Sequence, residues 1–404
     1  MNQTRRMWLI AIGIALAWVA ARSLMLLDWL WHGGFITSDL AYYFAVINSP
    51  DDVALIEYPA PILWLMRALR LVAGGEYGTF FVLFVVLIVA LDAFVTAYLL
   101  WRASPIAAGY WIMFLTLLGP IMWFRIDLIP AVFVTLGLTE MMRHPRFCGT
   151  MLAAGAAAKL WPALLILPLS GRDTASKRRI ISFAIVGAAL AAASVLITGW
   201  ERSASAISWQ IGRGLHIESL PATWLMIKKA TPGNSLLIEM SPYNAFELFG
   251  PGVSAALTMA SALLVVAIAC TIGLTIILLR RPGGARFAYL LAATAIIVAM
   301  IATNKTFSPQ YLIWLAGPLG LMLAWANTPL QHRLATKVAV LGCVIAALTQ
   351  LVFPLFYIGL LQNPATSTGI TVVLVVRNVL MAILALWLMV AAFLTAWRQS
   401  GTGK

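Results

Sequence analysis

A polar octapeptide interrupts the apolar C-terminal third of the chain. It reads Asn304-Lys305-Thr306-Phe307-Ser308-Pro309-Gln310-Tyr311 and stands between two stretches that are apolar enough to lie in lipid. A charged side chain at the centre of a bilayer costs roughly 2.5–3.5 kcal/mol on insertion scales, so a lysine here has to face water, protein or an anionic ligand. The octapeptide therefore indicates a functional site at a membrane boundary.

Polar residues also collect at four other places in the sequence. These are Ser38–Tyr43 together with Glu57–Pro61, Arg125–Asp127, Lys159, and Gln210–Ser219. If the five places meet at one level of a membrane, then Arg125, Lys159, Arg213 and Lys305 form a basin for an anion. A phosphate whose alkyl tail remains in the bilayer is the ligand that such a basin predicts.

Two acids in these segments are available for proton transfer. Asp39 follows the first apolar stretch in a polar turn, and Glu218 lies in the segment after Arg213. A carboxylate beside a cavity of low dielectric constant can have its pKa raised toward neutrality, which suits a general base. We predict Asp39 as the base.

Structural roles remain open for several of these residues. Arg125 and Asp127 stand at a predicted helix start and can pair with each other, whereas Lys159 and Lys305 can extend toward lipid headgroups. Asp92, inside a predicted span, indicates a structural polar contact. Arg377, at the start of the last span, fits either an interfacial anchor or the basin.

The composition requires a membrane. The chain has 404 residues, 62% of them hydrophobic and 10% charged, and its mean hydropathy is +0.94, which no water-soluble core of this length needs. The three cysteines lie in or beside apolar runs without metal-like spacing, so neither a disulfide framework nor a zinc site is predicted. The sequence thus predicts an all-α polytopic membrane protein.

The apolar runs predict about twelve transmembrane helices in a single domain covering residues 1–404. They lie near residues 7–31, 78–101, 106–123, 127–142, 147–158, 160–170, 179–200, 252–279, 287–303, 310–326, 337–361 and 370–397. Arg and Lys, from Arg5 and Arg6 to Arg398, gather in the segments on one side, where Asp173 is the only loop acid. The positive-inside rule makes that side the cytoplasm, with both termini, and explains the net charge of +13 without nucleic acid.

The spans at 147–158 and 160–170 are too short to cross a membrane singly, because about 20 residues are needed. A pair of short or broken helices, with its apex near Lys159-Leu160-Trp161-Pro162, fits this part of the chain. Two outer loops, about 32–77 and 201–251, carry most of the polar segments. Residues 62–72 have the apolar spacing of a helix that lies at the interface.

The polar segments together resemble the polytopic glycosyltransferases of the C superfamily (GT-C), most closely family 87. Its members are polyprenyl-phosphate-mannose-dependent alpha-mannosyltransferases of actinobacterial cell envelopes. The resemblance covers nearly the whole chain and rests on Asp39–Tyr43, Tyr58–Pro61, Arg125–Pro130, Lys159–Pro162, Gln210–Ser219 and Asn304–Tyr311. The last two are the most specific.

This resemblance implies a multi-pass protein of the plasma membrane with its active site on the extracytoplasmic face. Asp39 matches the aspartate that deprotonates the acceptor hydroxyl, and Arg125, Lys159, Arg213 and Lys305 would bind the donor phosphate. The implied reaction inverts the anomeric carbon and passes a mannosyl residue to a glycolipid or lipid-linked glycan. Further implied substrate-binding residues are Tyr42, Tyr58, Asp127, Gln210, His216, Glu218, Asn304, Gln310 and Tyr311.

No cofactor or metal is implied: Asp39 lacks a neighbouring second aspartate, and Asp51-Asp52 fits a solvated turn. The chain departs from the family pattern at Glu57. It departs from it again at His216, where we expect glutamine. These two differences leave the acceptor and the sugar open. An arabinofuranosyltransferase is one alternative. A secondary transporter or a lipid flippase is another, although residues 1–200 and 201–404 do not repeat each other as transporter halves often do.

Overall fold

The computed structural model describes residues 3–33, 35–51, 53–241, 244–280, 286–362 and 364–398. Asp52, which the sequence places in a solvated turn, lies outside these residues. Asp51, its neighbour, is exposed and pairs with Arg67.

The first half of the chain is helical. Its elements are α1 (Gln3–His32), α2 (Ser38–Val46), α3 (Ala60–Val72), α4 (Tyr77–Arg102), α5 (Pro105–Leu118), η1 (Pro120–Phe124), α6 (Leu128–Glu140), α7 (Pro145–Ala158), η2 (Trp161–Ile166) and α8 (Thr174–Gly212). The helix predicted over residues 62–72 corresponds to α3. The predicted break between the two short spans falls at Lys159, which is extended (φ −159°, ψ 132°) between α7 and η2.

The second half adds strands to the helices. Its elements are β1 (Leu215–His216), η3 (Leu220–Ala222), α9 (Thr223–Lys229), β2 (Leu237–Ser241), β3 (Ala245–Phe249), α10 (Val253–Leu279), α11 (Arg286–Thr303), η4 (Pro309–Leu315), α12 (Ala316–Trp325), α13 (Pro329–Gln350), η5 (Leu351–Leu355), α14 (Tyr357–Leu361) and α15 (Pro364–Arg398). The strands comprise two, five and five residues, and the structure as a whole is compatible with the predicted all-α polytopic fold.

Seven helices in the described part of the chain are long and apolar enough to cross a membrane: α1, α4, α8, α10, α11, α13 and α15. The other predicted spans coincide with shorter helical segments, among them α5, with 14 residues, and α6, with 13. A helical, membrane-embedded protein is therefore confirmed. Large apolar side chains such as Trp8, Leu196 and Val265 are exposed on α1, α8 and α10, as lipid-facing helices require.

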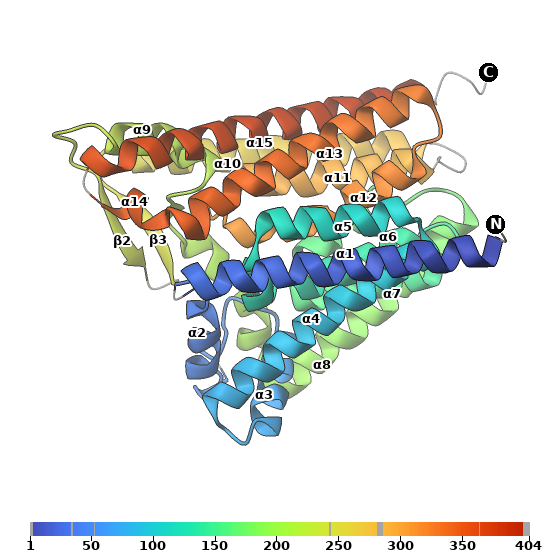
Figure 1. The fold of residues 1–404 in the computed structure, drawn as a ribbon, viewed down its shortest axis with the longest axis horizontal. Helices are drawn as coiled ribbons and strands as arrows, with labels where there is room; N and C mark the ends of the chain where they lie inside the picture. The colour runs from blue at the N-terminus through green and yellow to red at the C-terminus, as the bar shows by residue number, and fades with distance from the viewer. Residues whose placement is uncertain are drawn as a thin grey trace.

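The long helices form a bundle around a buried centre. Nearly every residue of α11 is buried, and α11 packs against α10, α12 and α15. α1 begins and α15 ends at the same end of the molecule, whereas α2, α14, β2 and β3 lie at the opposite end (Figure 1). The polar segments identified in the sequence gather at this second end.

Two features of the predicted loop 201–251 shape that end. The helix α8 continues into it through a bend at Gly199, whose backbone (φ 80°, ψ 168°) is left-handed and therefore favours glycine. Beyond α8, the strands form an antiparallel sheet in the order β1-β3-β2, with His216 opposite Glu247. The sheet joins the segment around His216 to the hairpin β2–β3.

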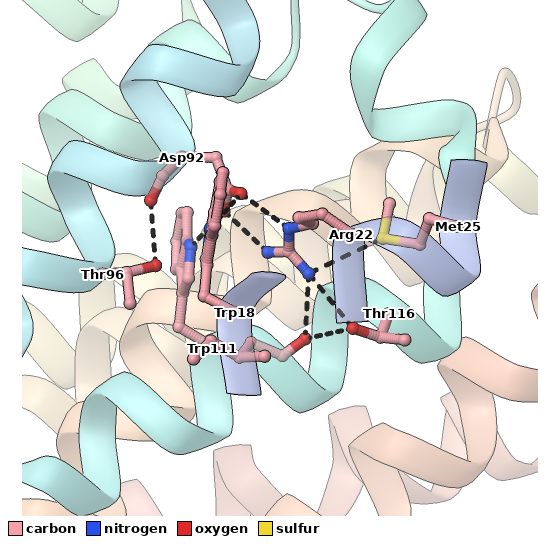
Figure 2. Close-up of polar contacts among 8 residues, drawn as sticks. Trp18, Arg22, Met25, Asp92, Thr96, Trp111 and Thr116 are labelled. Carbon is pink, nitrogen blue, oxygen red and sulfur yellow. Dashed lines mark hydrogen bonds and ion pairs between the residues drawn. The ribbon is translucent and has the colours of Figure 1, made fainter. Parts of the chain in front are cut away.

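Asp92 makes the structural contact that was predicted for it. Arg22 of α1 binds its carboxylate with two nitrogens, Nε to Oδ2 at 2.7 Å and Nη2 to Oδ1 at 2.8 Å. The indole nitrogens of Trp18 and Trp111 donate to the same carboxylate, each at 2.7 Å, and Figure 2 shows all three donors converging on it. This buried network fastens the largely exposed α1 to α4 and α5.

Candidate active site

The second end of the bundle holds a cavity of about 170 Å³. Residues from α2, from the segment before α3, from the ends of α7 and α8, from the sheet and from η4 form its wall. The predicted site residues in that wall are Asp39, Tyr42, Tyr58, Arg125, Lys159, Gln210, Arg213, His216, Glu218, Gln310 and Tyr311. The structure therefore brings together segments that span most of the chain.

Asp39 lies in the first turn of α2 and pairs with Arg125. Arg125 Nε is 2.9 Å from Asp39 Oδ2, and Arg125 Nη1 donates to the carbonyl oxygens of Ile36 at 3.0 Å and Phe124 at 3.1 Å. Burial raises the pKa of Asp39 above its ordinary value, and the charge of Arg125 opposes this rise. Arg125 is thus the counter-ion of the predicted base. Among the described residues it forms no ion pair with Asp127.

The second oxygen of Asp39 has a partner from the hairpin β2–β3. Asn244 donates its side-chain N–H to Asp39 Oδ1 at 3.3 Å. Asn244 has a left-handed backbone (φ 52°), which asparagine tolerates better than most residues. The contact holds the hairpin beside the predicted base.

Lys159 is held by an acid and by aromatic rings. Its Nζ lies 2.7 Å from Asp127 Oδ1, which also accepts from Trp314 Nε1 at 3.0 Å. The same Nζ lies 4.7, 5.3 and 5.7 Å from the ring centroids of Tyr311, Trp314 and Tyr58. These contacts fix a cation at the cavity wall, while Asp127 is fully buried behind it.

Lys305 and Asn304 lie next to the cavity and outside the wall that the described residues form. The carbonyl oxygen of Lys305 accepts from the N–H of His216 at 3.0 Å, and Asn304 Oδ1 accepts from the N–H of Thr306 at 2.8 Å. Asn304 and Lys305 therefore contribute to the turn near the start of the polar octapeptide. Burial lowers the pKa of Lys305, and the charge of Glu247 opposes this.

Arg213 lines the cavity just after α8 ends. The next residue, Gly214, donates its N–H to Glu247 Oε1 at 3.2 Å. A Cβ at position 214 would lie 2.3 Å from Glu247 Oε2, so a larger residue there would have to displace this carboxylate. The charge of Arg213 lowers the pKa values of Asp39 and Glu247, against the rise that burial causes in each.

Glu218 forms a buried ion pair with Arg377 of α15. The distance from Arg377 Nη1 to Glu218 Oε2 is 3.3 Å, and Arg377 Nη2 donates to the Glu218 carbonyl oxygen at 3.0 Å. Burial raises the pKa of Glu218 to about 7, with Arg377 opposing it. Arg377 is fully buried and sits 4.5 Å from the ring centroid of Phe307, which excludes an interfacial anchor.

His216 is neutral in this environment. Burial, followed by the charges of Arg213 and Arg377, lowers its pKa to about 3. Its Nδ1 accepts from the N–H of Glu218 at 3.2 Å, so the single proton of the neutral ring resides on Nε2. His216 can therefore donate a hydrogen bond to a ligand.

Several wall residues were not among the predicted site residues, although Glu57 and Ser308 belong to polar segments that the sequence analysis identified. Glu57, Ser308 and Asn244 contribute polar groups, while Phe353 and Tyr357 contribute rings. The sequence could have indicated Glu57, since it stands directly before Tyr58 in a polar segment. No pattern in the sequence indicates Asn244, because its position beside the cavity depends on the pairing of β2 with β3.

An apolar groove of about 530 Å³ starts beside the cavity, where Pro59 and Leu160 adjoin the wall residues Tyr58 and Lys159. The groove runs between α7 and α8 and is formed by Pro59, Ala60, Pro61, Ala153, Ala156, Ala157, Leu160, Phe183, Gly187, Leu190, Ala191, Ser194, Val195, Trp200, Ser203, Ala204, Ile207 and Ser208. Residues adjacent in sequence, Tyr58–Pro59 and Lys159–Leu160, thus line the polar cavity on one side and the apolar groove on the other.

The described residues contain no cluster of three or more His, Cys, Asp or Glu side chains that could hold a metal ion. No protein-family model matches the chain, and no curated protein matches it. The chemistry of the site therefore has to be inferred from its own geometry. That geometry provides a partly buried carboxylate for proton transfer, fixed cations that could face an anion, and an apolar groove that could take a chain attached to that anion.

Proposed function

We propose that this protein is a GT-C glycosyltransferase that transfers a mannosyl residue from a polyprenyl phosphate to a glycolipid or lipid-linked glycan. The observation that carries the proposal is that chain neighbours line a polar cavity and an apolar groove: Tyr58 and Lys159 line the cavity, and Pro59 and Leu160 line the groove. The cavity also has Asp39 and Arg213 in its wall, and the groove is suited to a polyprenyl tail. A ligand with a phosphate head and an apolar tail fits both parts.

The proposed reaction is a direct displacement. Asp39 accepts the proton of the acceptor hydroxyl as the acceptor oxygen bonds to the anomeric carbon. The bond from that carbon to the phosphate oxygen breaks, and its electron pair leaves with the polyprenyl phosphate. Lys159 and Arg213 stabilise the charge that grows on the phosphate, and attack opposite the leaving group inverts the anomeric carbon.

We propose about twelve membrane crossings, with both termini in the cytoplasm and the cavity on the extracytoplasmic face of the plasma membrane. The position of the cavity supports this, because it lies at the end of the bundle away from the start of α1 and the end of α15 (Figure 1). The basic residues between the predicted spans support the same orientation.

The test is transfer by the purified protein in liposomes. Radiolabelled polyprenyl-phosphate mannose is supplied with a crude envelope extract as the source of acceptor, and polyprenyl-phosphate arabinose is tested in parallel. We expect label from the mannose donor in a product that mannosidase cleaves. Transfer of arabinose alone would replace the proposed sugar, and transfer of neither sugar would refute the proposed function.

Blocking the groove should weaken binding of long donors specifically. Ala191 lines the groove, and tryptophan there would displace part of a tail; losing burial of two methylene groups costs about tenfold in affinity. We expect Ala191→Trp to raise the KM of a decaprenyl donor about tenfold and that of a geranyl donor much less. Ala192→Trp is the matched control, because Ala192 is exposed outside the groove. Equal effects on both donors would contradict a tail in the groove.

The pH dependence of transfer should report the pair Asp39–Arg125. A general base works when it is ionised, so the rate falls as pH drops through the pKa of Asp39, which burial raises. Removing the positive charge in Arg125→Gln raises that pKa further, and we expect the acidic limb to move up by about one pH unit or more. Arg67→Gln, at an exposed ion pair, should leave the limb in place. An unmoved limb in Arg125→Gln would contradict Asp39 as the titrating base.

A further inference from the structure

Glu57 occupies the cavity wall close to the predicted base. Tyr42, three positions after Asp39 on α2, donates its hydroxyl to Glu57 Oε2 at 3.2 Å. Asp39, Tyr42 and Glu57 all line the cavity. The cavity therefore offers a second carboxylate on the side where an acceptor hydroxyl would meet Asp39.

The partners of Glu57 differ from those of the other cavity carboxylates. Asp39 pairs with Arg125 and Glu218 with Arg377, whereas none of the ion pairs formed among the described residues includes Glu57. An ionised carboxylate accepts hydrogen bonds at both oxygens, about four in all, and the Tyr42 hydroxyl supplies one. Glu57 thus retains capacity to accept hydrogen bonds from a ligand.

The backbone that carries Glu57 is held rigidly. Arg202 is buried and donates Nη2 to the Leu55 carbonyl at 2.9 Å and Nη1 to the Tyr58 carbonyl at 3.0 Å. Ser205, also in the segment of α8 after the bend, donates to the Ile56 carbonyl at 2.9 Å. Three carbonyl groups of one turn are therefore fixed by α8.

This turn includes a strained residue. Leu55 has a φ of 46°, a left-handed conformation that is uncommon for a residue with a side chain. Such strain persists only where the surroundings enforce it, often at functional sites. Arg202 and Ser205 supply that enforcement, and the result is a fixed backbone from which the Glu57 carboxylate reaches the Tyr42 hydroxyl.

We infer that Glu57 binds hydroxyl groups of the acceptor sugar, next to the hydroxyl that Asp39 deprotonates. The placement on the acceptor rests on the proposed function. Lys159 and Arg213 suit the anionic head of the donor. The charge of Arg213 also acts on Glu57, but no direct ion pair within the described part of the chain occupies this carboxylate, so it suits neutral hydroxyl donors. The acceptor end is then a polyhydroxylated ring, and a simple alcohol would bind poorly.

Binding tests this inference without any transfer reaction. The full-length protein in nanodiscs is titrated with octyl α-D-mannopyranoside and, as a probe of the alkyl chain alone, with 1-octanol. We expect Glu57→Gln, which keeps the shape and removes the charge, to weaken binding of the mannoside about tenfold or more while octanol binding stays unchanged. Glu201→Gln is the control, since Glu201 is exposed on α8. Its mannoside affinity should match that of the wild type.

Two binding results would overturn the inference: equal mannoside affinity in Glu57→Gln and wild type, or a wild type that binds the mannoside no better than octanol. In the transfer assay, Glu57→Gln should raise the KM of the acceptor while the KM of the donor changes by less than about twofold. A higher donor KM instead would overturn the placement on the acceptor. If the wild type transfers no sugar but binds the mannoside through Glu57, the proposed function fails and the hydroxyl-binding role of Glu57 survives.

Discussion

Asp39→Asn should reduce sugar transfer by about 10²–10⁴-fold, the range that loss of a general base produces. The amide has nearly the shape of the carboxylate, and its oxygen can still face Arg125, which lies 2.9 Å from Asp39 in the native protein. The amide cannot accept the proton of the acceptor hydroxyl. We therefore expect kcat to fall while the KM of the donor stays near its wild-type value.

The choice of asparagine matters because Arg125 is buried. Alanine at position 39 would leave its charge without a counter-ion, and breaking a buried pair costs about 3–5 kcal/mol of stability. Asp51→Asn is the matched control, since Asp51 lies in the same predicted outer loop and forms an exposed pair with Arg67. Wild-type transfer rates in Asp39→Asn would rule out this residue as the base and turn attention to Glu218.

The largest effect on stability is expected in the network around Asp92. Asp92→Leu removes the acceptor of four N–H groups, two from Arg22 and one each from Trp18 and Trp111, and leaves the Arg22 guanidinium buried among apolar helices (Figure 2). We expect a loss of about 3–5 kcal/mol in the free energy of unfolding. Unfolding of the purified protein by heat or by denaturing detergent measures this loss.

A second substitution separates the charge from the packing. Arg22→Met combined with Asp92→Leu removes both charges, and we expect it to regain a large part of the stability, because a buried ion pair replaced by apolar groups is often neutral. The exposed pair Arg67–Asp51 provides the comparison, where removal of either charge should cost about 0–1 kcal/mol. If the Asp92→Leu variant is as stable as the wild type, then α1 is held by its packing against the neighbouring helices and does not need this polar network.

The sequence predicted the helices well because a membrane leaves the backbone few options. Long apolar runs have to satisfy their hydrogen bonds internally, so they form helices wherever they occur. The break at Lys159 was also predictable, since the apolar runs on either side are too short to span and Pro162 follows. The convergence of polar segments followed from counting the crossings between them.

The pairing of charges could not be predicted in the same way. Arg125 and Asp127 are neighbours in the sequence, yet Arg125 pairs with Asp39 and Asp127 with Lys159, because an extended residue and a helix start direct the two side chains apart. Asp92 finds Arg22 across 70 positions. Such contacts depend on how helices pack, and no local pattern encodes that.

The sheet was missed for a related reason. β1 has two residues and β2 and β3 have five each, too few for an alternating pattern to stand out within a long polar loop. The sequence placed Glu57 in a polar segment, but the conformation of the turn that carries it depends on hydrogen bonds from Arg202. Arg202 follows the bend at Gly199, which the sequence did not predict. Functional residues on tertiary supports of this kind require the structure.

The segment of α8 after Gly199 links two parts of the molecule. In this segment, Trp200, Ser203 and Ala204 line the apolar groove. Arg202 and Ser205 donate hydrogen bonds to backbone carbonyls of the turn that carries Glu57. A lipid that seats fully along the groove stabilises the same few helical turns that hold the carboxylate in place. Under the proposed function we expect tail occupancy and acceptor affinity to be reciprocally coupled, so that a shortened donor loses selectivity for the acceptor as well as its own affinity.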